Sequence, residues 1–152
     1  MATYRLAAIV LLAGLAACAS ERVHTMSFAS LREAQAAGAV ERGWVPAILP
    51  AGAYELRAAY EPSGRRRWGL FNFRPDEADA LRSAMAAEET TFDAMRIDIP
   101  GRIEWWPVAM RGDLDSQALS ATGLRVYRAR AAPLVFAVNW SQGRAYYWSV
   151  GP

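Results

Sequence analysis

Two neighbouring stretches, residues 54–61 and 66–73, are rich in aromatic and other apolar residues, and such extended runs predict two β-strands. Proline, serine and glycine at positions 62–64 supply a turn, so the two stretches are predicted to form a β-hairpin. A turn at residues 141–143 joins the last two of three further strand-like stretches, at residues 123–130, 133–140 and 144–150. The hydrophobic pattern therefore predicts a sheet whose strands run mainly antiparallel.

Two helices are predicted from apolar residues that recur at helical spacing. Ser30 and Glu33 match a capping box at the start of a helix over residues 30–37. Pro75 begins the second helix, which extends to about residue 87 and carries a core-facing stripe of Ala78, Leu81 and Met85. The element order is strand, helix, loop, hairpin, helix, loop and three antiparallel strands. It predicts a small single α+β domain, mainly antiparallel sheet with two helices.

An unbroken apolar run occupies residues 6–17 behind Arg5, and this arrangement is typical of a secretory signal peptide. As a helix the run would span roughly 18 Å, too short for a hydrocarbon core of roughly 30 Å. Its end, Leu-Ala-Ala-Cys at 15–18, resembles a bacterial lipobox, where signal peptidase II cuts before a lipid-bearing cysteine. An ordinary signal peptide or a short buried helix is the alternative. We predict a cleaved lipoprotein signal peptide over 1–17, lipidated Cys18 with a short tether over 18–25, and an α+β periplasmic domain over 26–152.

Cys18 is the only cysteine of the chain, so no disulfide can form within it. A thioether-linked lipid would account for a single cysteine in an oxidising compartment. Ala19 and Ser20 follow without an aspartate at the retention position, a pattern typical of lipoproteins sorted to the outer membrane. We therefore expect the protein to be anchored in the outer membrane through the lipid at Cys18 and to face the periplasm, with surface exposure as the alternative.

The charge and the residue types present limit the classes of function. The formal net charge is +2, and Arg5 leaves with the signal peptide, so the mature chain is close to neutral and no nucleic-acid partner is expected. His24 is the only histidine and lies in the predicted tether, which leaves none in the domain for a catalytic triad or a histidine-bearing metal site. We predict no metal, no cofactor and no enzymatic activity.

Several short strings together resemble a family of bacterial lipoproteins with a YbbD head domain. They are Glu41–Pro46 (ERGWVP), Leu49–Pro50 (LP), Phe71–Phe73 (FNF), Trp105–Pro107 (WWP) and Ala145–Ser149 (AYYWS). The most specific element is Arg-Gly-Trp-x-Pro-x-x-Leu-Pro. The resemblance spans roughly residues 24–151. It implies an envelope location and a single folded unit over that range, but no reaction and no catalytic residue. The first hairpin turn differs, because EPSGRRR stands where an Asp- or Asn-rich turn is expected.

Two groups of residues form the predicted binding surface. Trp105 and Trp106 are neighbours in an extended segment, where successive side chains point to opposite sides, so one is expected to be exposed and to stack on a sugar ring or a partner protein. Arg65, Arg66 and Arg67 form the sharpest basic cluster. They are expected either to be a solvated hairpin tip or to contact anionic headgroups or lipopolysaccharide phosphates through bidentate hydrogen bonds.

These features favour a non-catalytic binding or accessory module, held at the membrane, that meets an envelope protein or a glycan. The alternative is a periplasmic glycan-acting enzyme. Such an enzyme needs two carboxyl groups about 5–10 Å apart, one of them kept protonated by an apolar wall. Glu104, beside the tryptophan pair, together with Asp113 or Asp115 is the candidate carboxylate pair.

Overall fold

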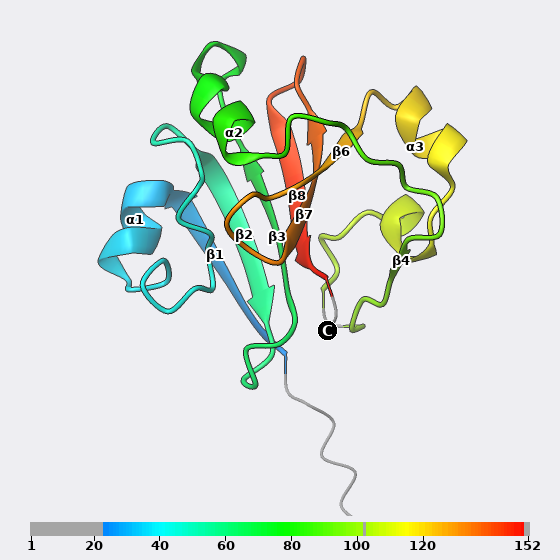
Figure 1. Ribbon diagram of the computed structural model, residues 1–152. Helices are drawn as coiled ribbons and strands as arrows, with labels where there is room; N and C mark the ends of the chain where they lie inside the picture. Colours follow the sequence, from blue (N-terminus) through cyan, green and yellow to red (C-terminus); the bar gives the residue numbers. More distant parts are fainter. Residues whose placement is uncertain (1–22, 102, 151–152) are drawn as a thin grey trace, which may run out of the picture.

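The computed structural model describes residues 23–101 and 103–150. Its centre is a six-stranded antiparallel sheet in the order β1-β2-β3-β8-β7-β6 (Figure 1). The strands are β1 (His24–Ser30), β2 (Tyr54–Tyr60), β3 (Arg67–Asn72), β6 (Arg125–Arg128), β7 (Leu134–Asn139) and β8 (Arg144–Ser149). A separate two-stranded ribbon pairs β4 (Arg96–Ile97) with β5 (Gly112–Asp113). The predicted hairpin and the three closing antiparallel strands are confirmed.

The helices are short and join the strands. They are α1 (Leu31–Ala36), α2 (Asp79–Ala84) and α3 (Ser116–Ala121), with 3₁₀ turns η1 (Pro75–Glu77) and η2 (Val108–Met110). The Ser30 half of the predicted capping box is confirmed, since the Ser30 hydroxyl accepts a hydrogen bond from the Glu33 backbone N–H at 3.2 Å. The Glu33 carboxylate accepts from the Ala29 backbone N–H instead of that of Ser30. Across residues 23–101 and 103–150, the helices are all too short or too polar to cross a membrane.

The second predicted helix differs in length and type from the element observed. Pro75 begins the 3₁₀ turn η1, and α2 follows only from Asp79 and ends at Ala84, because Met85 already has extended backbone. Helix α3, which was not among the two predicted, begins where the Asp115 carboxylate accepts a hydrogen bond from the Ala118 backbone N–H. The fold class remains the predicted one, a small α+β domain that is mainly antiparallel sheet.

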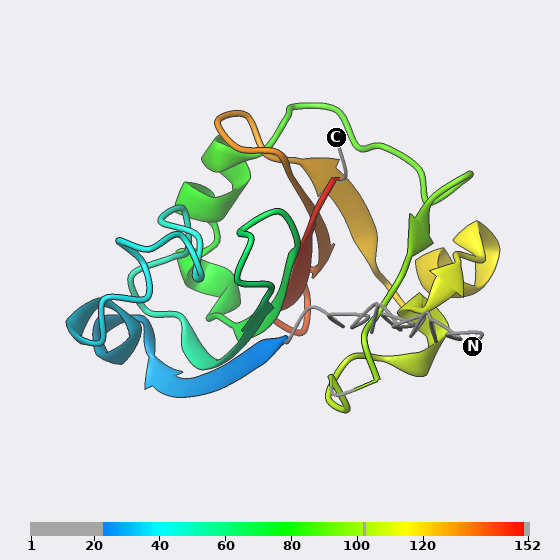
Figure 2. The ribbon, with the colours of Figure 1, turned by 90° about the horizontal axis from the view of Figure 1, so that it is seen from below.

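Two hydrophobic cores lie on opposite faces of the large sheet. Helices α1 and α2 cover one face, and the segment from β4 to α3 lies on the other side (Figure 2). The first core contains Leu31, Leu56, Phe71, Leu81, Phe136 and Tyr147. The second core contains Trp68, Ile103, Trp106, Leu119, Val135 and Trp148. Because neighbouring side chains of a strand point to opposite faces, β3, β7 and β8 contribute to both cores.

Strand β1 begins earlier than the sequence indicates. His24 pairs in register with Tyr60 of β2, and the two rings stack with centroids 5.4 Å apart. His24 and Thr25 therefore lie in the sheet, inside the segment predicted to be a tether. The tyrosine ring also stacks on Trp44, at 4.3 Å, so this end of the sheet is fixed by three successive rings.

A glycine in β3 leaves space for the buried ring of Tyr147. Gly69 pairs with Tyr147, and a Cβ atom built on the glycine would lie 2.0 Å from Cζ of the tyrosine ring. The ring can therefore lie flat against the β3 backbone, where its hydroxyl donates a hydrogen bond to the Trp44 carbonyl at 3.2 Å. Burial raises the pKa of Tyr147 well above its ordinary value, although the charge of Arg67 opposes this.

Candidate functional site

Part of the second sheet face is hollowed rather than filled by a core. A groove of about 610 Å³ crosses β1, β2, β3 and the first part of β8, and one tryptophan from the segment before η2 forms part of its lining. We call it the sheet groove. Its main lining residues are Ser27, Glu55, Arg57, Asn72, Trp105, Arg144 and Tyr146. A concave site with a few polar groups on a rigid sheet is the usual geometry of a ligand site.

A chain of polar side chains crosses this groove between strands. Asn72 is 6% exposed, and its Nδ2 donates a hydrogen bond to Oε2 of Glu55 at 2.5 Å. Its Oδ1 accepts a hydrogen bond from Nε of Arg144 at 2.8 Å. The buried amide is thus satisfied on both sides and fixes a carboxylate and a guanidinium on either side of it.

Glu55 reaches this position through an unusual backbone conformation. The pairing of β2 with β3 shifts register between Tyr54 and Arg57, and Glu55 within this irregularity has a φ of 50°. A left-handed conformation costs a non-glycine residue about 1–2 kcal/mol. Residues in such conformations tend to occur at functional sites, so this is a reason, independent of the cavity, to examine the groove.

Two arginines face the groove with their charges uncompensated by ion pairs. Arg144 uses Nε for the bond to Asn72, and no ion pair within residues 23–101 and 103–150 involves either Arg144 or Arg57. The Nη1 and Nη2 groups of Arg144 have no hydrogen bond to any part of the domain that the structure describes. Since Arg144 lines the groove, these N–H groups are donors available to a ligand there.

The two predicted tryptophans differ in their surroundings. Trp106 is 1% exposed in the second core, and its Nε1 donates a hydrogen bond to the Met110 carbonyl at 2.8 Å. Trp105 is only half-buried, packs against Trp106 with ring centroids 6.0 Å apart, and lines the groove. The structure therefore places the first ring at the candidate site and the second beneath it.

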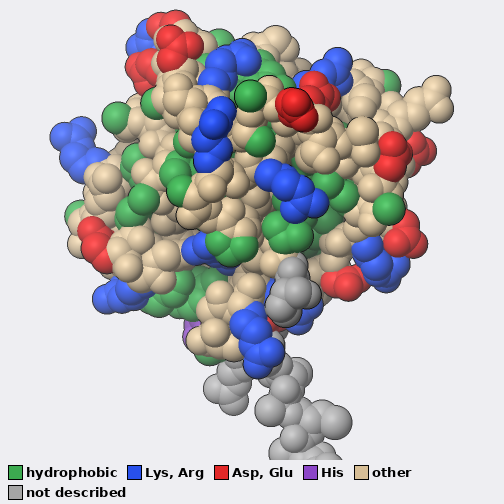
Figure 3. Space-filling view, viewed as in Figure 1, with side chains coloured by type: hydrophobic (Ala, Val, Ile, Leu, Met, Phe, Trp, Pro, Cys, Tyr) green, Lys and Arg blue, Asp and Glu red, His purple; other side chains and the backbone are tan. Residues whose placement is uncertain are grey.

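The predicted arginine cluster lies elsewhere, at the β2–β3 turn. Arg66 forms an ion pair of 2.5 Å with Glu61, whose side chain is 2% exposed, and Nη1 of Arg67 donates a hydrogen bond to the Gly43 carbonyl. Of the three arginines, only Arg65 has no such bond to the part of the chain that the structure describes, and its side chain is exposed. Basic side chains are scattered among acidic and apolar ones over the face shown in Figure 3. Two of the three guanidinium groups are thus held by contacts within the domain.

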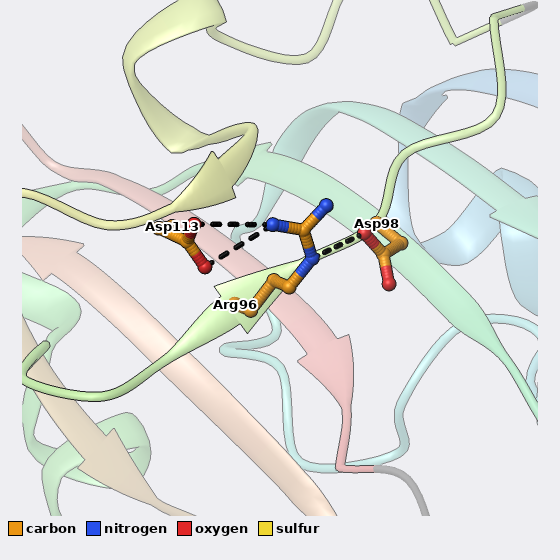
Figure 4. Close-up of polar contacts among 3 residues, drawn as sticks. All are labelled: Arg96, Asp98 and Asp113. Atoms are coloured by element: carbon orange, nitrogen blue, oxygen red, sulfur yellow. Dashed lines mark hydrogen bonds and ion pairs between the residues drawn. The ribbon is translucent and has the colours of Figure 1, made fainter.

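The three candidate carboxylates differ in their surroundings. Asp113 receives two hydrogen bonds of 3.2 Å from Nη1 of Arg96, whose Nε donates to Asp98 at 2.9 Å (Figure 4). The bond to Asp113 and the two carboxylate charges raise the pKa of Arg96. Asp115 caps α3, and Glu104 is exposed. Each of these acids is therefore solvated or occupied by a structural contact.

Sequence reasoning did not single out Glu55, Asn72 and Arg144, which form the centre of the groove. A signal was present, because Asn72 stands between Phe71 and Phe73 and must face away from the core that the two rings enter. What the sequence does not reveal is that β3 pairs with β8, which places Asn72 opposite Arg144. Cys18, the predicted lipidation site, lies outside the described residues.

Comparison with protein families gives one match. Residues 22–72 match the family model described as the YbbD head domain, and this confirms the predicted resemblance over these residues. The matched part covers β1, α1, β2 and β3 and is less than half of the chain. The strings at 105–107 and 145–149 lie outside it, so the resemblance is shown over a shorter range than predicted. Searches of curated proteins and of solved structures find no match.

Proposed function

We propose that the protein is a lipid-anchored, non-catalytic binding module of the bacterial envelope and that the sheet groove is its ligand site. The observation that carries this proposal is the bonded chain from Glu55 through buried Asn72 to Arg144, beside the half-buried Trp105. It fixes a carboxylate and a guanidinium on strands of the sheet, beside an aromatic ring in the same groove, and a binding site needs groups fixed in this way.

The anchoring part of the proposal rests on the lipobox-like residues that end in Cys18. Strand β1 begins six positions later, at His24. Six extended residues reach at most about 20 Å, so the anchored domain would remain next to its membrane. An outer-membrane location facing the periplasm follows from the residues after the cysteine.

Binding is favoured over glycan cleavage by the state of the acids in the groove. Glu55 accepts a hydrogen bond from Asn72, and Glu33 accepts one from the Ala29 backbone N–H at 2.6 Å. Both side chains are exposed, and neither lies in an apolar enclosure of the kind that keeps the acid of a glycosidase protonated. These carboxylates act as fixed hydrogen-bond acceptors in this proposal.

Site-specific photocrosslinking in the native envelope tests the proposal. A photoreactive amino acid replaces Trp105 in the groove or, as the control, Arg128, an exposed residue of β6. We expect adducts with an envelope component from position 105 only, and we expect Arg144→Gln to abolish them. Equal labelling at both positions, or no adduct at 105, would contradict the proposal. Mass spectrometry of the mature N-terminus, with Cys18→Ser as the control, tests the anchor separately.

A further inference from the structure

A second, apolar chamber adjoins the sheet groove. It has a volume of about 220 Å³ and is lined mainly by apolar side chains near η2 and α3, including Met110, Leu119 and Leu124. Arg144 and Tyr146 line both spaces. A cavity of about 150 Å³ is enough for a benzene ring, so this chamber has room for the side chain of a leucine or a phenylalanine.

The group at the junction has a defined chemical preference. Asn72 holds Nε of Arg144, while Nη1 and Nη2 have no bond to the described part of the domain. A guanidinium whose edge is presented in this way matches the two oxygens of a carboxylate. Since the apolar chamber begins beside this arginine, a ligand that satisfies both features carries an apolar group close to a carboxylate.

The remaining groove requires a ligand longer than a free amino acid. The groove extends from Arg144 across β3 and β2 to Ser27 on β1, and its volume of about 610 Å³ is well beyond that of one residue. Glu55 offers an acceptor for backbone N–H groups, and Trp105 offers an aromatic surface. A sugar would satisfy the polar groups but has no apolar substituent that fills the second chamber.

From these features we infer that the sheet groove binds the C-terminal end of a peptide whose last residue is apolar. This inference rests on the proposed function and specifies its ligand. The terminal carboxylate lies on the Arg144 fork, the last side chain enters the apolar chamber, and the preceding residues follow the groove past Glu55 and Trp105. Capture of a C-terminal carboxylate by fixed N–H donors is a recurring mode of peptide recognition.

Fluorescence anisotropy of the full chain with labelled tetrapeptides tests the inference. The probes are Gly-Ala-Ala-Leu as the free acid, the same peptide as the C-terminal amide, and Gly-Ala-Ala-Gly as the free acid. We expect the acid that ends in leucine to bind at least tenfold more tightly than either of the others. Arg144→Gln should remove the preference for the acid, whereas Arg128→Gln, an exposed arginine on β6, should leave it unchanged.

A second variant tests the chamber without disturbing the arginine. Ala109 is exposed and lines the chamber, so Ala109→Trp should fill it without altering the buried core. We expect this variant to bind the leucine and glycine peptides equally while it still prefers acid over amide. Thermal unfolding of each variant is measured alongside to show that the domain remains folded.

Several results would overturn the inference. They are equal binding of acid and amide, equal binding of leucine and glycine termini, equal losses in Arg144→Gln and Arg128→Gln, and the absence of peptide binding. Free leucine that binds as tightly as the peptide would show that the ligand is an amino acid instead. Displacement of the peptide by an N-acetylglucosamine trimer would show that the groove takes a sugar. If the sugar displaces the peptide and position 105 still forms a crosslink, the groove is a binding site as proposed, and only the inference that its ligand is a peptide is wrong.

Discussion

The two faces of the large sheet are built by the same strands but differ in what covers them. On the first face α1 and α2 close over a continuous core that includes Leu56, Phe71 and Tyr147. On the second face the core covers β6, β7, part of β8 and the ends of β2 and β3 that carry Ala59 and Trp68. The rest of β2 and β3, together with β1, carries polar residues that line the sheet groove. The first face therefore serves stability, while the second is divided between stability and a candidate binding site.

This comparison shows how a small domain gains a site without losing its core. Each strand of a sheet has two sets of side chains, and β3 places Phe71 in the first core and Asn72 in the groove. A substitution on one face therefore leaves the packing of the neighbouring side chain, on the other face, largely as it was. Substitutions of adjacent residues should accordingly have effects of different size and kind, and the predictions below follow from that expectation.

The largest expected difference in stability is between the two adjacent tryptophans. Trp106→Ala removes a fully buried indole and its hydrogen bond to Met110, so it should lower the free energy of unfolding by about 3–5 kcal/mol. Trp105→Ala should lower it by about 1 kcal/mol, because that ring is half-buried at the groove. Urea denaturation of both variants measures the difference. Equal losses would show that the groove wall is part of the core.

Gly69→Ala should have the next largest effect, on the first face. The added methyl group would collide with the ring of Tyr147, which is enclosed by the core and cannot move aside. Overpacking of this kind costs about 1–3 kcal/mol. Gly101→Ala is the matched control, since a Cβ there has no neighbour within 4 Å. If both glycine variants unfold at the same urea concentration, the close approach in β3 does not limit packing.

Tyr147→Phe should cost about 1 kcal/mol at neutral pH, through loss of the hydrogen bond to the Trp44 carbonyl. It should also change the pH dependence of stability. Burial raises the pKa of Tyr147 above the ordinary value of 10.0, so above that pH only the unfolded chain readily releases the proton. The stability of the wild-type protein should fall as the pH rises past 10, and the phenylalanine variant should fall less. Parallel pH profiles for the two proteins would contradict this account.

The smallest expected change in stability is at Glu55, on the groove. Glu55→Gly removes the acceptor of the Asn72 hydrogen bond but suits the positive φ, so the two effects should nearly cancel. Glu55→Ala loses the same acceptor and keeps the backbone strain. It should be less stable than the glycine variant by about 1 kcal/mol. Thermal or urea unfolding of the pair measures the strain directly, and equal stabilities would show that residue 55 adopts another conformation in solution.

Local signals in the sequence were enough to predict most of the elements. The hairpins follow from strand-like runs and turn residues, and α1 follows from the capping pair Ser30 and Glu33, whose hydrogen bond is present. Helix α3 was missed because its six residues bury only Leu119, which gives no periodic stripe. The unequal burial of Trp105 and Trp106 was expected, but the reason given was wrong, because residues 104–106 form a turn and not an extended segment.

The candidate site was less predictable because it depends on contacts between distant parts of the chain. Asn72 and Arg144 are brought together by the pairing of β3 with β8, and no local pattern specifies that pairing. The left-handed backbone of Glu55 gives no sequence signal either, since glutamate is an unusual residue for that conformation. The cluster at Arg65, Arg66 and Arg67 is conspicuous in the sequence, yet two of its members are held by Glu61 and the Gly43 carbonyl.

The position of β1 has a mechanical consequence if the chain is anchored at Cys18. Tension from the membrane would enter the domain at His24 and run along β1, which is an edge strand held by β2 from His24 opposite Tyr60 to Ser30 opposite Tyr54. Antiparallel hydrogen bonds lie across the strands, so a force along β1 loads all of them together in shear. Strand β1 would resist being pulled from the sheet as one unit, and a ligand held in the groove would remain connected to the membrane under load.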